Sequence, residues 1–159
     1  MPAFRTALVA AILAITSGAA TYAQQPTTTY LYDADGRSTG TLRRSDNTTS
    51  EYDASGRLTG TLRSQGTTTT EYDQNGRIEG TARSSGSATW FTDAQGRASG
   101  RSVTSGDTVT YYGADGRLQG TARRQGDRTY FHDADGKSAG WLQGQVEIDF
   151  WPLPAEKGR

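Results

Sequence analysis

Arginine and aromatic residues return at regular intervals along this 159-residue chain, and their chemistry suits the binding of an anionic or ring-shaped ligand. Arginine carries a planar fork of donors that pairs with carboxylate or phosphate groups. Exposed aromatic rings on a sheet offer a surface on which a partner can stack. We therefore predict a ligand-binding surface whose members are Arg43, Arg63, Arg83, Arg123, Trp90, Tyr111, Tyr130 and Trp141.

Both residue types also have structural interpretations. The aromatic residues, together with Phe91 and Phe131, can form a core beneath a C-terminal cap, which is the interpretation we favour. A second basic column can form an ion-pair ladder with the aspartates that open the same turns, and exposed pairs of this kind contribute only about 0.2–1 kcal/mol each. This second column consists of Arg37, Arg57, Arg77, Arg97, Arg117 and Lys137.

No motif in the sequence points to catalysis or to a bound metal. Asp33-Ala34-Asp35-Gly36 and its copy at residues 133–136 resemble the start of a calcium loop, but Arg37 and Lys137 would repel a cation at the next position. There is no phosphate loop and no cysteine, and the single histidine, His132, replaces a repeated tyrosine. We expect a protein that is not an enzyme and that has no metal and no cofactor.

The chain between residues 24 and 142 is a tandem repeat with a period of 20 residues. Glycine recurs at two positions of each unit, as in Gly56 and Gly60, and no gaps interrupt the series. The units share a turn of the form Asp-x-x-Gly-Arg, in which Gly113 replaces the aspartate of the fifth copy and Lys137 replaces the arginine of the sixth. A shorter turn such as Gln65-Gly66 follows it, and short threonine-rich runs separate the two turns. This pattern predicts one β-hairpin per unit.

The longer turn also predicts a register. If Asp53 pairs with Arg57, then Tyr52 lies opposite Leu58, and Gly60 falls on the same face as Tyr52. We expect the tyrosine ring to cover this glycine, with Glu51 on the other face.

We therefore predict an all-β fold: a tandem antiparallel β-hairpin array of about 12 strands that forms an open coiled sheet. Residues 143–159, in which Val146, Ile148 and Phe150 alternate with acidic residues, are expected to form a C-terminal capping strand and tail. The free edges of an open sheet would favour self-association.

Residues 1–23 have the features of a signal peptide: a basic Arg5, a short apolar run and small residues up to Ala23. We expect export to the periplasm or beyond the cell, with no stable membrane span after cleavage. Loss of Arg5 leaves 16 basic and 17 acidic residues, which argues against a nucleic-acid partner.

The unit YDASGRLTGTLR resembles the YD repeat of the RHS family, and the resemblance extends over roughly residues 30–142. Copies such as TDAQGRASGRSV are degenerate. The resemblance implies a β-hairpin repeat with an exported, interaction-related role. Large members of the family resemble β-shells around a C-terminal toxin, and this chain is too short to form such a shell.

These observations predict an exported, non-enzymatic repeat protein that acts as a binding or scaffold module at the cell envelope or outside the cell. Its partner is a protein or a glycan. Two alternatives remain open: a component of an RHS-type toxin/immunity system, and a purely structural envelope protein.

Overall fold

The computed structural model describes residues 27–144, which form twelve β-strands and no helix. Their bounds are β1 Thr27–Tyr32, β2 Ser38–Ser45, β3 Thr48–Asp53, β4 Leu58–Gln65, β5 Thr68–Asp73, β6 Ile78–Ser85, β7 Ala88–Asp93, β8 Ala98–Ser105, β9 Thr108–Gly113, β10 Leu118–Gln125, β11 Arg128–Asp133 and β12 Ser138–Gln143. All neighbouring strands are antiparallel. The predicted all-β class with about 12 strands is thus confirmed.

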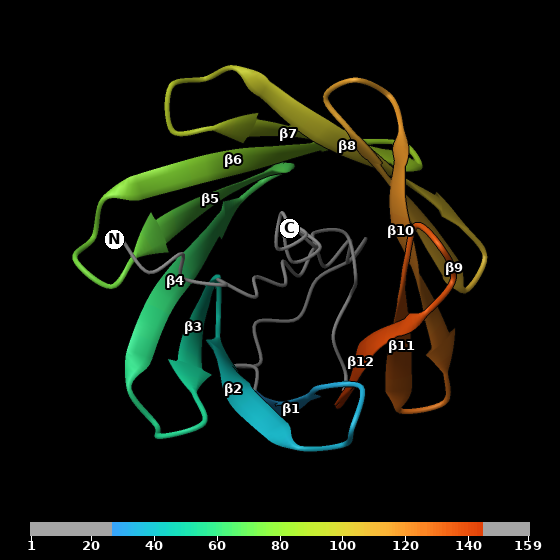
Figure 1. The fold of residues 1–159 in the computed structure, drawn as a ribbon. Coiled ribbons are helices and arrows are strands. Elements are labelled where there is room, and N and C mark those ends of the chain that lie inside the picture. Colours follow the sequence, from blue (N-terminus) through green and yellow to red (C-terminus); the bar gives the residue numbers. More distant parts are fainter. Residues whose placement is uncertain (1–26, 145–159) are drawn as a thin grey trace, which may run out of the picture.

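The sheet closes into a barrel, so the prediction of an open coiled sheet is wrong (Figure 1). β1 pairs with β12 through Tyr30 and Gln143, Leu31 and Leu142, and Tyr32 and Trp141. The physical reason is accumulated curvature, because every repeat adds sheet twist and one β-bulge, and wide twisted sheets tend to curl until their ends meet. The two strands that an open sheet would leave as free edges, β1 and β12, thus pair with each other over Tyr30–Tyr32.

The longer turn has the predicted form. In the second repeat the backbone N–H of Asp53 donates to the carbonyl of Arg57 at 2.9 Å, and Gly56 has a φ of 79°. The Asp53 carboxylate accepts hydrogen bonds from the N–H groups of Ser55 and Arg57. Aspartate therefore starts the turn, and glycine takes the left-handed position that other residues avoid.

The register differs from the prediction beyond this turn. Tyr52 lies opposite Leu58 as expected, but Glu51 then pairs with Gly60, and Thr59 is the extra residue of a β-bulge. Gly60 therefore shares a face with Glu51 rather than with Tyr52. A Cβ atom on Gly60 would lie 2.9 Å from the Tyr72 carbonyl oxygen, so the close approach of β5, not a tyrosine ring, requires glycine there.

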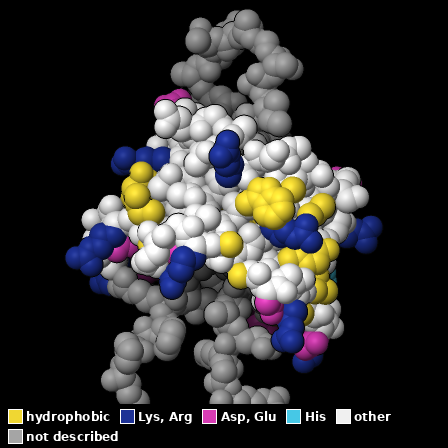
Figure 2. Space-filling view, turned by 90° about the horizontal axis from the view of Figure 1, so that it is seen from above, with side chains coloured by type: hydrophobic (Ala, Val, Ile, Leu, Met, Phe, Trp, Pro, Cys, Tyr) yellow, Lys and Arg dark blue, Asp and Glu magenta, His cyan; other side chains and the backbone are white. Residues whose placement is uncertain are grey.

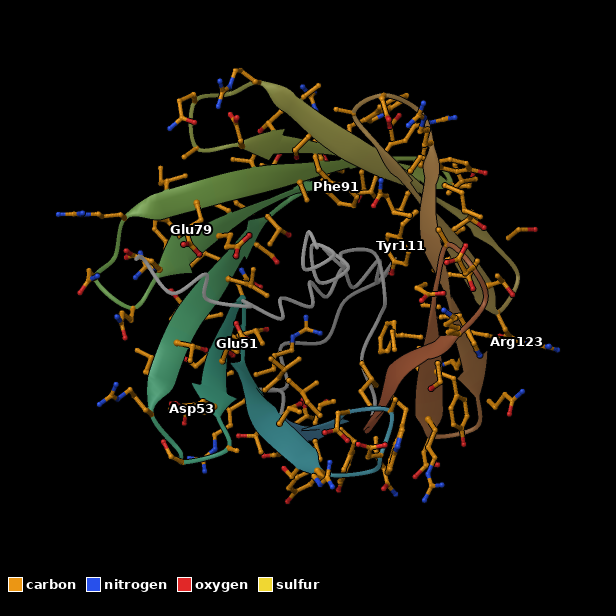
Figure 3. All side chains as sticks on the ribbon, viewed as in Figure 1. Glu51, Asp53, Glu79, Phe91, Tyr111 and Arg123 are labelled. Carbon is orange, nitrogen blue, oxygen red and sulfur yellow. The ribbon has the colours of Figure 1, made fainter. Side chains whose placement is uncertain are left out.

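The inner side of the barrel wall holds the core, as Figure 3 shows for Phe91 and Tyr111. The larger cluster of buried residues comes from strands on both sides of the closure: Leu31, Leu42, Val109, Tyr111, Ala122, Phe131 and Leu142. A second, smaller cluster contains only Leu62 and Ala82, with Phe91 packed against both clusters. The inner wall is therefore unevenly apolar around its circumference.

The proposed signal peptide and residues 145–159 of the proposed cap lie outside the described residues. β12 ends at Gln143, close to the predicted boundary of the repeat array. Between residues 27 and 144 there is no helix with the length and hydropathy that crossing a membrane requires.

Candidate functional site: an outer belt of arginine and aromatic residues

The outer face of the barrel carries a belt in which arginine side chains lie beside aromatic rings. Strand alternation places the column of Arg43 on the face opposite the buried leucines. The guanidinium of Arg43 lies 5.0 Å from the centre of the Tyr52 ring, and that of Arg63 lies 5.1 Å from Tyr72. We call this surface the outer belt; it consists of Arg43, Arg63, Arg83, Arg101, Arg123, Tyr52, Tyr72, Trp90, Tyr112, Tyr130 and Trp141.

The belt is densest around β7 and β8. Trp90 pairs with Arg83 on one side and Arg101 on the other, and Arg101 pairs in turn with Tyr112. The Arg101 guanidinium lies 5.9 Å from the Trp90 ring and 4.8 Å from the Tyr112 ring. Figure 2, which views the outer wall on the β6–β8 side, shows hydrophobic side chains directly beside Lys and Arg side chains.

One member of the belt, Trp141, lies at the closure of the barrel and has two neighbours from outside the belt. The rings of Tyr32 and Trp141 stack across the β1–β12 pair, with centres 3.9 Å apart and an interplanar angle of 10°. The Arg128 guanidinium covers the Trp141 ring at 4.7 Å. Because both faces of Trp141 have neighbours in this way, we assign it to the closure more than to a ligand.

Seven of the eight predicted binding residues lie on the outer face, and Tyr111 does not. Tyr111 is only 2% exposed and packs in the inner core, so it cannot share a surface with Trp90 or Tyr130. Phe91 and Phe131 lie on the same inner side. The aromatic residues of the C-terminal half are therefore divided between the inner core and the outer face, and strand alternation decides on which side each residue lies.

The other basic column lies at the turns. The expected pairing across a turn occurs between Arg97 and Asp93 at 2.7 Å. Arg37 instead pairs with Asp35 at 2.8 Å, within the turn itself. Hydrogen bonds hold the pKa values of the exposed turn carboxylates below their usual range: a Ser55 side-chain hydrogen bond is the main cause for Asp53, and backbone donors at residues 77 and 97 are the main causes for Asp73 and Asp93.

A group of acidic residues on the inner wall was not predicted as a site. Glu51, Glu71 and Glu79 line one small pocket together with Thr59 and neighbouring backbone. Burial, followed by the charge of Glu71, raises the pKa of Glu51 to about 8. Burial, followed by Glu79, raises the pKa of Glu71 to about 7. The repeat carries a signal for this group, because Glu51 and Glu71 are acidic at a position where the other copies have Leu31 or an aromatic residue.

The acidic pocket is suited to holding protons rather than a substrate. Its volume is about 10 Å³, which corresponds to roughly one water molecule. Within residues 27–144, no three His, Cys, Asp or Glu side chains are grouped so as to hold a metal ion. The outer belt therefore remains the better candidate for binding a ligand.

The comparisons with known proteins bear on the fold alone. No protein-family model matches the chain, and the search of curated proteins also found no match. One solved structure, an X-ray structure of a protein from Arabidopsis thaliana, superposes with a TM-score of 0.51, covering 80% of this chain and 84% of that one at 10% identity. This likeness supports the closed all-β architecture.

Proposed function

We propose that this chain is an exported, non-enzymatic binding protein whose outer belt recognises an anionic glycan at the cell envelope or outside the cell. The observation that carries the proposal is the repeated placement of arginine beside aromatic rings on the outer wall, as with Arg43 over Tyr52 and Arg63 over Tyr72. Guanidinium groups pair with carboxylates, while rings support the flat faces of sugars.

Two features of the chain favour a glycan over other partners. A strand-adding peptide needs an exposed sheet edge, and β1 and β12 pair with each other. The near balance of 16 basic and 17 acidic residues after residue 23 disfavours bulk attraction to nucleic acid, and it means that an anionic glycan must be recognised locally, by the arginines and rings of the belt.

The test is a binding assay of the purified protein with polygalacturonate, a carboxylated polysaccharide, and with uncharged dextran. The wild type is expected to bind polygalacturonate, with affinity falling as salt is added. Replacing all four arginines of the column, Arg43, Arg63, Arg83 and Arg123, by alanine is expected to abolish binding.

The matched control removes four charges from the turn column instead: Arg37, Arg57, Arg77 and Arg117 to alanine. This variant is expected to bind as the wild type does. Equal loss in both variants would indicate bulk charge attraction, and no binding by the wild type would refute the proposed function.

A further inference from the structure

Because the copies are equivalent, each residue on the outer face can be compared with its counterparts in the other copies. The β7–β8 hairpin differs from them in two ways. The residue at the position of Arg101 is threonine in four other copies: Thr41, Thr61, Thr81 and Thr121. Arginine normally occurs two residues later in the unit, where β8 has Val103 instead. The arginine of this repeat has thus moved by two residues along the same face of the strand.

This displacement changes what the arginine contacts. Position 103 pairs with Ala88 and Thr110, whereas position 101 pairs with Trp90 and Tyr112. The guanidinium of Arg101 consequently lies between two rings, closer to Tyr112 at 4.8 Å than to Trp90 at 5.9 Å. Two rings thus orient the Arg101 guanidinium, whereas the guanidinium groups of Arg43 and Arg63 each have one ring beside them.

Trp90 is the second departure. Other copies carry Tyr30, Ser50, Thr70, Thr110 or Tyr130 at this position, so the fold does not require a large ring. Trp90 is 51% exposed, so about half of this large apolar side chain remains open to solvent. An exposed tryptophan beside an oriented arginine is better explained by a partner than by packing.

We infer that Trp90, Arg83, Arg101 and Tyr112 form the principal subsite for a carboxylated polysaccharide chain, with Trp90 stacking on a sugar ring and the two arginines pairing with carboxylates on either side. This inference rests on the proposed function and assigns it to one place on the belt.

The geometry fits such a ligand. Arg83 and Arg101 lie on β6 and β8, two strands apart, which separates their backbones by roughly 10 Å. That separation is comparable to a disaccharide unit, so carboxylates on alternate sugars can meet both arginines while the intervening ring lies on Trp90. The wall is convex and open here, which suits an extended polar chain more than a peptide side chain that needs a groove.

The experiment compares single variants of the purified protein in titrations with polygalacturonate. Trp90→Thr and Arg101→Thr introduce residues that other copies carry, so both are expected to fold normally, which circular dichroism checks. Each is expected to raise the Kd at least tenfold. The matched control Arg57→Ala, in the turn column outside the belt, is expected to change the Kd less than threefold. Arg43→Ala, in the belt but far from β7, is expected to weaken binding less than Arg101→Thr does.

Tryptophan fluorescence provides an independent readout. Polygalacturonate is expected to quench the wild-type emission, and Trp90→Thr is expected to remove the quenching although two other tryptophans remain. Equal weakening by Arg43→Ala and Trp90→Thr would overturn the subsite and leave the proposed function intact. Absence of wild-type binding, or tighter binding to a single-stranded polyuridine probe, would overturn both.

Discussion

The inner wall of the barrel has two unlike sectors built on the same repeat position. In β3 and β5 this position holds Glu51 and Glu71, whereas in β9 and β11 it holds Tyr111 and Phe131. The backbone pairing is the same in both sectors, because each residue lies opposite a glycine of the next strand. The hairpin geometry therefore fixes where this residue lies on the inner wall, but it does not determine whether the residue is acidic or aromatic.

The two sectors should contribute differently to stability. Phe131 and Tyr111 belong to the larger core cluster, and Phe131 is 1% exposed. Glu51 is 8% exposed, and burial of its carboxyl group carries a desolvation cost that keeps it protonated. The aromatic sector therefore stabilises the barrel, while the acidic sector stabilises it only when its carboxyl groups are neutral.

Alanine at the two kinds of position should give the largest contrast. Phe131→Ala leaves a cavity in the core and is expected to lower the free energy of unfolding by about 3–5 kcal/mol. Glu51→Ala is expected to lower it by less than about 1 kcal/mol at pH 8, because it also removes the desolvated carboxyl group. Urea unfolding followed by circular dichroism measures both, and similar losses at the two positions would contradict the comparison.

The second prediction concerns the pH dependence of the wild type. The pKa of Glu51 rises to about 8 and that of Glu71 to about 7 in the fold, from 4.5 in the unfolded chain. The folded state therefore binds more protons than the unfolded state between these values. The stabilising contribution is fully present below about pH 4.5 and is lost as pH rises to 8, at up to about 1.4 kcal/mol per pH unit for each group.

Urea unfolding between pH 4.5 and 8.5 tests this slope. The double variant Glu51→Gln/Glu71→Gln is expected to flatten the profile, while Phe131→Leu should lower the whole curve without changing its slope. The turn aspartates do not interfere, because their lowered pKa values affect stability only below about pH 4. A maximum of the wild-type free energy of unfolding at pH 8 would show that ionising the buried carboxyl groups of Glu51 and Glu71 does not destabilise the fold.

Converting an acidic position into an apolar one should sharpen the comparison further. Glu51→Leu introduces the residue that Leu31 provides at the equivalent position. It is expected to raise the free energy of unfolding by about 2 kcal/mol at pH 8, with a smaller gain at pH 4.5, where the carboxyl group is already neutral. Unfolding curves at the two pH values measure the difference, and an equal gain at both would show that charge is not the cause.

The smallest expected effect comes from the bulge residue beside Glu51. The Thr59 hydroxyl donates to the Glu51 carbonyl at 3.3 Å, and a hydrogen bond from Thr59 also lowers the pKa of the Glu51 carboxyl group. Thr59→Ala should reduce stability by about 0.5–1 kcal/mol and raise the pKa of Glu51 further. Carboxyl NMR titration measures this pKa, with Thr121→Ala on the outer face as a control that should leave it unchanged.

Local chemistry explains why the hairpins could be predicted. Asp53 and Gly56 form their turn through contacts within five residues, and the two-residue turn at Gly66 is equally local, with a φ of 59°. The arginine column was also predictable in part, since a residue recurring every 20 positions in identical hairpins must occupy one face of one sheet. The face of the sheet on which these arginines lie depends on the β-bulge at Thr59. The turn motifs do not predict this single extra residue.

The sequence by itself determined the all-β class, the two turns of each unit and the recurrence of arginine on one face, because these depend on contacts between near neighbours. Only the tertiary structure decided that β1 meets β12, that Tyr111 is buried while Trp90 is exposed, and that Glu51, Glu71 and Glu79 share a pocket. Closure and burial depend on twist and bulges summed over twelve strands, and the small contribution of each repeat is not visible in any one of them.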